Sequence, residues 1–206
     1  MDMVTFNFLR QYGESGVWWH TNWLGTPAHK CPLDLWIYQE ILFRTRPDVI
    51  IETGTLFGGS ALYLASMCDL LGNGRVITID VEENKERPRH PRILYLTGSS
   101  VAPEVVDRVK AEVADASRVM VILDSDHHDD YVLRELQVYG PLVTENCYLI
   151  VEDTPAGELF PELWGAGPSA AVKEYMRSDK SFVIDQDCEK FLLTFNPGGY
   201  LKRVAA

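Results

Sequence analysis

Residues 48–66, DVIIETGTLFGGSALYLAS, place a short apolar run, a glycine-rich turn and a helical pattern directly after one another. The run at 48–52 is apolar without alternation, which predicts a strand buried on both faces. Gly54 would let the backbone turn tightly and let a ligand approach it closely. Apolar residues at helical spacing continue from 59 to 71, and glycines end the pattern. The stretch predicts the strand–turn–helix unit of an α/β protein, and it lacks the GxGxxG fingerprint of nicotinamide-dependent enzymes.

The same alternation of strands and helices continues along the chain. Further buried strands are predicted at 75–80, 92–96, 118–124 and 147–153, and helices at 33–46, 103–114, 131–139 and 169–177. The segments 181–185 and 190–196 resemble an antiparallel pair. The pattern predicts a doubly wound, mostly parallel, Rossmann-like α/β sheet whose last strand is antiparallel. We expect one domain, 1–206, with an aromatic-rich N-terminal cap and helix at 1–46 and the core at 47–206.

The composition restricts the partners of the chain. Thirty acidic and nineteen basic residues give a net charge of −11, which disfavours nucleic acid because phosphate binding needs a basic face. No apolar run approaches the roughly 18 residues of a membrane helix, and the first residues do not resemble a signal peptide. The four cysteines are far apart in sequence and are expected to be reduced thiols. These features predict a cytoplasmic protein without a membrane or nucleic-acid partner.

Acidic residues and glycines follow the predicted strands where sheets of this class bind ligands. The carboxyl ends of parallel strands meet at one edge of the sheet, so side chains there share a crevice. Glu52 ends the first predicted strand, and its carboxylate suits a ligand with a cationic centre and an amine. Asp80 ends the next strand, a place from which an acid can bind ribose hydroxyls. Gly98 and Ser99 follow the third strand and suit either an adenine pocket or a plain turn.

A dense acidic cluster follows the fourth predicted strand, in the sequence ILDSDHHDD at 122–130. The fifth predicted strand ends with Glu152 and Asp153 adjacent. If these two strands are neighbours, Asp124 or Asp126 converges with that pair. Neither motif contains a basic residue, and carboxylate oxygens are the ligands that Mg²⁺ prefers. The sequence therefore predicts a divalent-cation site here, with either aspartate as a candidate ligand.

The other residues of this cluster have different expected roles. His127 is a candidate general base, because an imidazole titrates near neutral pH and lies beside the predicted metal site. An exposed or core histidine is the alternative for this position. His128 is expected to be a bystander. Asp129 and Asp130 are expected to begin the following helix, where acids favour the positive end of the helix dipole.

Together these motifs resemble the class I S-adenosylmethionine (SAM)-dependent methyltransferases. The chain is most similar to the family named cephalosporin hydroxylase or rhamnosyl O-methyltransferase. The resemblance extends from about Trp23 to Arg203 and includes WLGTP, PLDLWIYQEIL, RPDVIIETGTLFGGSALYLAS, LDSDH and YLIVEDT. The fold and motifs of that family imply methyl transfer rather than hydroxylation, since no iron-binding facial triad is evident in the sequence.

The resemblance implies a ligand for each motif. It assigns the cofactor SAM to Glu52, Gly54, Gly58, Ser60, Asp80, Gly98, Ser99 and Asp124. It assigns Mg²⁺, or another divalent cation, to an aspartate of LDSDH together with the acidic pair of YLIVEDT, thus to Asp124, Asp126, Glu152 and Asp153. Of the two aspartates, Asp124 at the strand tip is the preferred ligand.

The resemblance also implies a base. In relatives that methylate sugars, a histidine three residues after the metal aspartate takes the proton, which points to His127, with Asp126 as a further catalytic candidate. Some relatives carry another histidine four residues later, where this chain has Tyr131. In the implied mechanism the cation lowers the pKa of an acceptor hydroxyl, His127 removes the proton, and the oxygen displaces S-adenosylhomocysteine from the methyl group.

Other functions remain compatible with these residues. A nicotinamide-dependent oxidoreductase would also use Asp80, a metal-dependent hydrolase would use the acidic motifs, and a non-catalytic scaffold protein would bind cofactor without turnover. Two aromatic and glycine-rich segments, 18–26 and 155–167, suit a small-molecule acceptor. A sugar, a catechol and a polyketide-like aglycone all stack on aromatic side chains, so the sequence does not choose among them. We expect a homo-oligomer.

Overall fold

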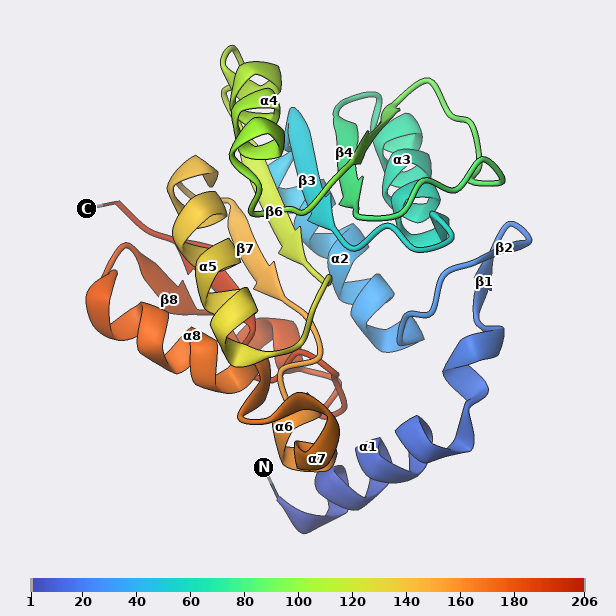
Figure 1. The fold of residues 1–206 in the computed structure, drawn as a ribbon, viewed down its shortest axis with the longest axis vertical. Helices are drawn as coiled ribbons and strands as arrows, with labels where there is room; N and C mark the ends of the chain where they lie inside the picture. Colours follow the sequence, from blue (N-terminus) through green and yellow to red (C-terminus); the bar gives the residue numbers. More distant parts are fainter. Residues whose placement is uncertain (1, 206) are drawn as a thin grey trace.

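The computed structural model describes residues 2–205, and a seven-stranded sheet forms its centre (Figure 1). The strands are β3 (Val49–Thr53), β4 (Arg75–Asp80), β5 (Ile93–Thr97), β6 (Val119–Leu123), β7 (Tyr148–Val151), β8 (Phe182–Ile184) and β9 (Tyr200–Arg203). They lie in the order β5-β4-β3-β6-β7-β9-β8. The pairs from β5 to β7 are parallel, whereas β9 is antiparallel to both of its neighbours. This topology confirms the predicted doubly wound α/β sheet with an antiparallel last strand.

Helices cover both faces of the sheet because its central strands are apolar on both sides. Every residue of β3 and β6 is buried, so each strand needs a helical layer on either face. One face packs against α2 (Pro32–Thr45) and α3 (Gly59–Leu71). The other face packs against α4 (Pro103–Val113), α5 (Asp129–Tyr139) and α8 (Gly167–Ser178). Since both faces are covered, only the strand ends and the sheet edges are left to build a site.

The prediction of a strand at 190–196 is wrong. This segment forms a turn and a loop after a short 3-10 helix, η3 (Gln186–Glu189), and the strand that pairs with β8 is β9. The backbone N–H of Phe195 donates to Asp34 Oδ2 at 3.0 Å, and the hydroxyl of Thr194 donates to Asp34 Oδ1. Asp34 is buried in α2, and its carboxylate needs donors. The segment therefore satisfies a distant carboxylate instead of joining the sheet.

The N-terminal cap lies beyond the carboxyl ends of the parallel strands (Figure 1). It consists of α1 (Met3–Ser15), η1 (Val17–His20) and a small hairpin of β1 (Asn22–Trp23) and β2 (Thr26–Pro27). The remaining short helices are η2 (Gly140–Leu142), α6 (Ala156–Leu159) and α7 (Pro161–Trp164). Asp2 caps α1, since its Oδ1 accepts hydrogen bonds from the N–H groups of Val4 and Thr5 at 2.9 and 3.1 Å. Within residues 2–205, no helix combines the length and the apolarity that crossing a membrane requires.

Candidate functional site

A cavity of about 1140 Å³ lies between the strand ends and the N-terminal cap. Residues from α1 and η1 line it on one side, and residues from α6 and α7 line it on another. Most of the site residues predicted from the sequence line this cavity: Gly54, Asp80, Gly98, Ser99, Asp124, Asp126, His127, Glu152 and Asp153. The structure thus brings together residues that follow different strands of the sheet, as the parallel topology requires.

The turn after β3 depends on glycine. Gly54 has φ +86°, and a Cβ atom there would lie 1.8 Å from the backbone oxygen of Asp124. Its N–H donates to the carbonyl of Ile79 at 2.9 Å. Gly58, with φ +82°, precedes α3 and is close to the Tyr95 hydroxyl, 3.1 Å from where its Cβ would be. The backbone of this turn is therefore held directly against β4 and against the loop after β6.

Asp80 ties the glycine turn to the end of β4. Its Oδ2 accepts a hydrogen bond from the N–H of Leu56 at 2.7 Å and lies 3.2 Å from the buried Arg87 guanidinium. Its Oδ1 accepts from the N–H of Glu82 at 3.0 Å. Each oxygen keeps acceptor capacity, and Asp80 lines the cavity. The carboxylate is fixed in place and able to receive hydroxyl donors from a ligand.

Glu52 and Ser60 lie outside the cavity lining. Glu52 is completely buried in β3, where its Oε2 accepts from the Thr78 hydroxyl at 2.6 Å. Its Oε1 has no partner among residues 2–205. Burial raises the pKa of Glu52, although the charge of Lys30 and the Thr78 hydrogen bond oppose the shift. Ser60 is buried in the first turn of α3. Neither side chain therefore faces the cavity directly.

The turn after β5 forms a hydroxyl network. Gly98 has φ +141°, and a Cβ there would lie 2.7 Å from a methyl group of Val105. The Ser99 hydroxyl lies 2.8 Å from the Tyr131 hydroxyl. Tyr131 also lies 3.1 Å from the Ser100 hydroxyl, which continues to the buried Glu135. Tyr131, which stands where some relatives carry a second histidine, therefore belongs to the Ser99 side of the cavity.

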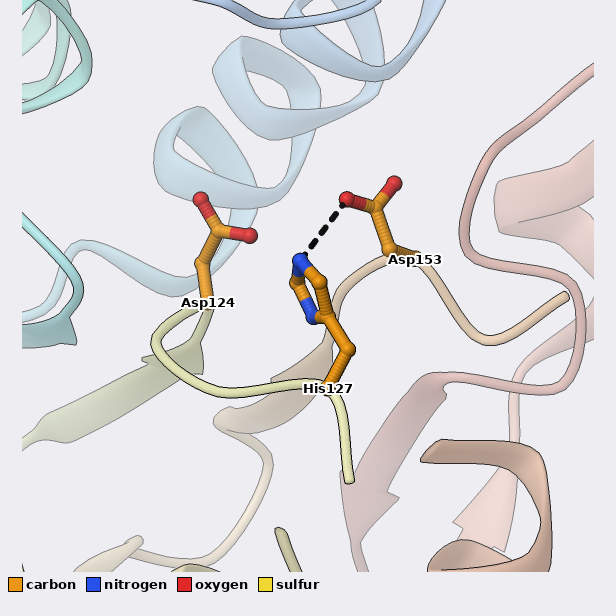
Figure 2. A group of neighbouring side chains, drawn as sticks. All are labelled: Asp124, His127 and Asp153. Carbon is orange, nitrogen blue, oxygen red and sulfur yellow. Dashed lines mark ion pairs between the residues drawn. The ribbon is translucent and has the colours of Figure 1, made fainter. Parts of the chain in front are cut away.

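Asp124, His127 and Asp153 form a compact group with the donor set of a metal site (Figure 2). One ligand atom from each lies within 4.8 Å of the others, and His127 Nε2 is 3.3 Å from Asp153 Oδ2. Burial and the nearby Asp124 raise the pKa of Asp153, while His127 and Lys30 oppose the shift. Asp153 has φ +49°, a left-handed conformation that aspartate tolerates better than most residues. The two carboxylates offer hard oxygen ligands that fit a divalent cation, and the imidazole lies beside them.

Asp126 is turned toward a different partner. Its Oδ1 accepts from the N–H of His128 at 2.8 Å and lies 2.6 Å from His128 Nδ1. These contacts raise the pKa of His128 and, against partial burial, lower the pKa of Asp126. Asp126 lines the cavity but is not part of the group formed by Asp124, His127 and Asp153. Of the two candidate aspartates, the structure places Asp124 with the other donors.

Both carboxylate oxygens of Glu152 contact residues outside the two acidic motifs, Tyr38 and Lys30. Its Oε1 accepts from the Tyr38 hydroxyl at 2.7 Å, and its Oε2 lies 2.7 Å from Lys30 Nζ. Lys30 also forms an ion pair with Asp124 Oδ2. Burial and the neighbouring Asp124 raise the pKa of Glu152 well above its ordinary value. Sequence reasoning missed Lys30, because the acidic motifs themselves contain no basic residue and Lys30 lies 94 residues before Asp124.

Comparisons with known proteins agree on one family. The sequence model of the family Rhamnosyl O-methyltransferase/CmcI matches residues 15–204. A rhamnosyl O-methyltransferase of Mycobacterium leprae (strain TN) is 33% identical over 210 residues, covering 98% of this chain and 91% of that protein.

Solved structures agree on the fold. An apo-structure of CmcI has a TM-score of 0.69 and 22% identity, covering 90% of this chain and 77% of that chain. A structure of CmcI described with Mg and SAM has a TM-score of 0.68 and 20% identity, with the same coverage of 90% and 77%. The resemblance found in the sequence motifs is confirmed, and it favours methyl transfer over the oxidoreductase and hydrolase alternatives. The chain therefore belongs to the Rhamnosyl O-methyltransferase/CmcI family of SAM-dependent O-methyltransferases.

Proposed function

We propose that the chain transfers the methyl group of SAM to a hydroxyl of a small molecule and requires a divalent cation, Mg²⁺ first, for the reaction. The observation that carries the proposal is the convergence of Asp124, His127 and Asp153 within 4.8 Å at the cavity. Hard oxygen ligands favour Mg²⁺ over softer metals. A relative described with Mg and SAM has the same fold, which supports this choice of ions and cofactor.

SAM would occupy the side of the cavity formed by the glycine turn and the ends of β4 and β5. The absence of a side chain at Gly54 leaves the backbone open to a ligand, and Asp80 offers carboxylate oxygens for ribose hydroxyls. Gly98 and Ser99 line the same side, at the position expected for adenine. Glu52 and Ser60 would not contact the cofactor directly, since neither lines the cavity.

His127 would take the proton of the acceptor hydroxyl. Its Nε2 lies 3.3 Å from Asp153 Oδ2. Its ring packs against Trp164 with centroids 4.9 Å apart and an interplanar angle of 78°. The His127 ring is therefore held between the Asp153 carboxylate and the Trp164 indole. Mg²⁺, when bound, supplies a Lewis acid that makes an acceptor hydroxyl more acidic. Asp153 Oδ2, 3.3 Å from His127 Nε2, orients the imidazole toward the carboxylates.

The acceptor side of the cavity is aromatic. Trp18 and Trp19 are stacked with ring centroids 4.3 Å apart, and His29 packs edge-on against Trp19 at 4.9 Å. Phe160 and Trp164 line the cavity from α7 and the residue before it. Flat apolar walls suit the ring of a sugar or an aromatic aglycone. A sugar hydroxyl is the first candidate, because the similar mycobacterial protein is named a rhamnosyl O-methyltransferase.

A methyl-transfer assay with isotope-labelled SAM tests the proposal directly. A panel of glycosides, catechols and macrolide-like alcohols is incubated with the protein in excess Mg²⁺ or excess chelator. We expect labelled product with at least one class of acceptor, and only when Mg²⁺ is present. Equal turnover in Mg²⁺ and in chelator would contradict the cation requirement, while labelled product formed without any hydroxyl acceptor would contradict O-methylation.

A further inference from the structure

Arg87 is a buried guanidinium that the proposed reaction leaves without a role. It lies in the loop between β4 and β5, and only 5% of its side chain is exposed. Within residues 2–205, Arg87 and Lys30 are the lysine and arginine residues that line the cavity. A buried charge is tolerated only where partners compensate for its lost hydration, so the contacts of Arg87 indicate what it does.

The contacts of Arg87 close a ring around one residue of the glycine turn. Its Nε donates to the carbonyl oxygen of Leu56 at 2.9 Å, and its Nη2 lies 3.2 Å from Asp80 Oδ2. The same Oδ2 accepts a hydrogen bond from the N–H of Leu56 at 2.7 Å. Both main-chain polar groups of Leu56 are therefore held by the ion pair of Arg87 and Asp80.

Leu56 has a backbone conformation that needs such support. Its φ is +47°, in the left-handed region that is unfavourable for leucine because of its Cβ atom. The residue is 51% exposed, so packing of its side chain contributes little to holding it. Leu56 lines the cavity midway between Gly54 and Gly58. If Leu56 relaxed to a more favourable φ, the turn against which SAM is proposed to bind would change shape.

The loop that carries Arg87 is anchored on β5. The Tyr95 hydroxyl donates to the carbonyl oxygen of Pro88 at 2.8 Å, and the Arg87 guanidinium lies 5.9 Å from the centroid of the Tyr95 ring. Pro88 also borders the turn, since a Cβ on Gly58 would lie 3.1 Å from its Cδ. Arg87 therefore reaches Leu56 from a loop that is itself packed in place.

We propose that Arg87 is a positioning residue for the cofactor. It holds Leu56 in the left-handed conformation and so keeps the glycine turn in the shape that binds SAM. The forked guanidinium reaches the carbonyl of Leu56 and the carboxylate of Asp80 at the same time, which the single ammonium of a lysine does not do in this geometry. The role of Arg87 is thus geometric rather than a matter of charge alone. This inference rests on the proposed function, because it places SAM against this turn.

Titration calorimetry with S-adenosylhomocysteine on the full chain tests the inference. Arg87→Lys keeps the positive charge beside Asp80 but loses the fork, so we expect about tenfold weaker binding, the effect of one lost charge-assisted hydrogen bond. Arg87→Met, which also removes the charge, should bind about as weakly as Arg87→Lys. Arg92→Lys is the matched control, because Arg92 pairs with Asp69 outside the cavity lining, and it should leave the affinity unchanged.

A second background separates a role through Leu56 from a general loss of structure. Glycine adopts the left-handed region freely, so Leu56→Gly makes the turn less dependent on Arg87. In that background, Arg87→Lys should weaken binding by no more than about threefold. Leu24→Gly is the matched background, since Leu24 also has φ +47° but does not line the cavity. There the loss caused by Arg87→Lys should remain about tenfold.

Several results would overturn the inference. Wild-type affinity in a folded Arg87→Lys protein, checked by circular dichroism, would contradict the geometric role. A loss in the Leu56→Gly background as large as in the wild type would show that Arg87 acts on the cofactor without Leu56. If Arg87→Lys alone does not fold, its double variant with Leu56→Gly still decides, because it should bind within about threefold of Leu56→Gly.

Failure of this inference differs from failure of the proposed function. If the wild type does not bind S-adenosylhomocysteine, the proposed function itself is wrong. If the wild type binds it and the Arg87 variants bind it equally well, only the role of Arg87 is wrong.

Discussion

The two sides of the cavity are built in different ways. The proposed cofactor side, from Gly54 to Ser99, depends on backbone shape: glycines at positive φ, close approaches between main chains, and one carboxylate that receives N–H groups. The acidic side depends on side chains from distant segments, including Lys30, Asp124 and Asp153. The first side should therefore be sensitive to added atoms and tolerant of charge changes nearby. The second should be sensitive to a change of a single charge.

The largest effect is expected on the cofactor side. Gly54→Ala would place a methyl group 1.8 Å from the backbone oxygen of Asp124, so the turn and the loop after β6 must separate. We expect binding of S-adenosylhomocysteine to become undetectable by calorimetry. Gly72→Ala is the matched control, since Gly72 has φ +68° but an added methyl group there would meet nothing within 4 Å. It should cost about 1 kcal/mol of stability and leave cofactor binding intact. Normal cofactor binding by Gly54→Ala would contradict the claim that this side of the cavity depends on backbone shape.

On the acidic side, Asp153→Asn tests sensitivity to charge. Asparagine tolerates the φ of +49° at this position, so the substitution removes a charge with little change in backbone conformation. We expect methyl transfer to fall to the level measured in excess chelator, with cofactor binding unchanged. Asp126→Asn, outside the group, should retain activity within a few-fold. If Asp153→Asn remains fully active while Asp126→Asn is inactive, the group has been assigned to the wrong residues.

His127→Ala separates two roles that the same position allows. As a general base, His127 should contribute on the order of 10²–10⁴-fold to turnover. Mg²⁺ affinity should then change little, because the proposed ligands, Asp124 and Asp153, are carboxylates. His128, which is exposed and paired with Asp126, provides the control, and His128→Ala should be nearly silent. A large loss of Mg²⁺ affinity in His127→Ala would mean that the histidine is a ligand rather than the base.

The smallest effect concerns the buried hydroxyl network beside the cofactor side. Burial raises the pKa of Glu135 from 4.5 to about 7, although hydrogen bonds from Ser100 and Ser125 oppose the shift. The folded chain therefore binds this proton more tightly than the unfolded chain. Stability falls as the pH rises from about 4.5 to about 7, and the full penalty of about 3 kcal/mol applies above that window.

Glu135→Gln should remove this penalty while keeping an acceptor for the two serines. We expect the variant and the wild type to melt at similar temperatures at pH 5, and the variant to melt about 5–10 °C higher at pH 8. Glu83→Gln, at an exposed position, is the matched control and should show no such divergence. A constant difference between Glu135→Gln and the wild type across this pH range would argue against a shifted carboxyl group.

The same contrast explains what the sequence could and could not predict. The glycine turn, Asp80 and the acidic motifs were predictable, because strand, turn and helix signals are local and parallel strand ends meet at one edge. Lys30 was not, since no local pattern links it to carboxylates about a hundred residues away. The prediction of a strand at 190–196 was wrong for the same reason. The Thr194 hydroxyl and the Phe195 N–H donate to Asp34, which lies far earlier in the chain. Local sequence patterns thus predicted where the carboxylates lie, but not that Lys30 pairs with them.

The central claim is that the acidic side of this cavity binds one divalent cation that methyl transfer needs. The most direct test is titration of Mg²⁺ into the chain saturated with S-adenosylhomocysteine, for the wild type and for Asp124→Asn. Asp124 is the residue shared by Lys30 and the group that includes His127 and Asp153, so its charge should matter most. We predict one ion per wild-type chain and no measurable binding by Asp124→Asn. Absence of binding by the wild type, or equal binding by both proteins, would contradict the claim.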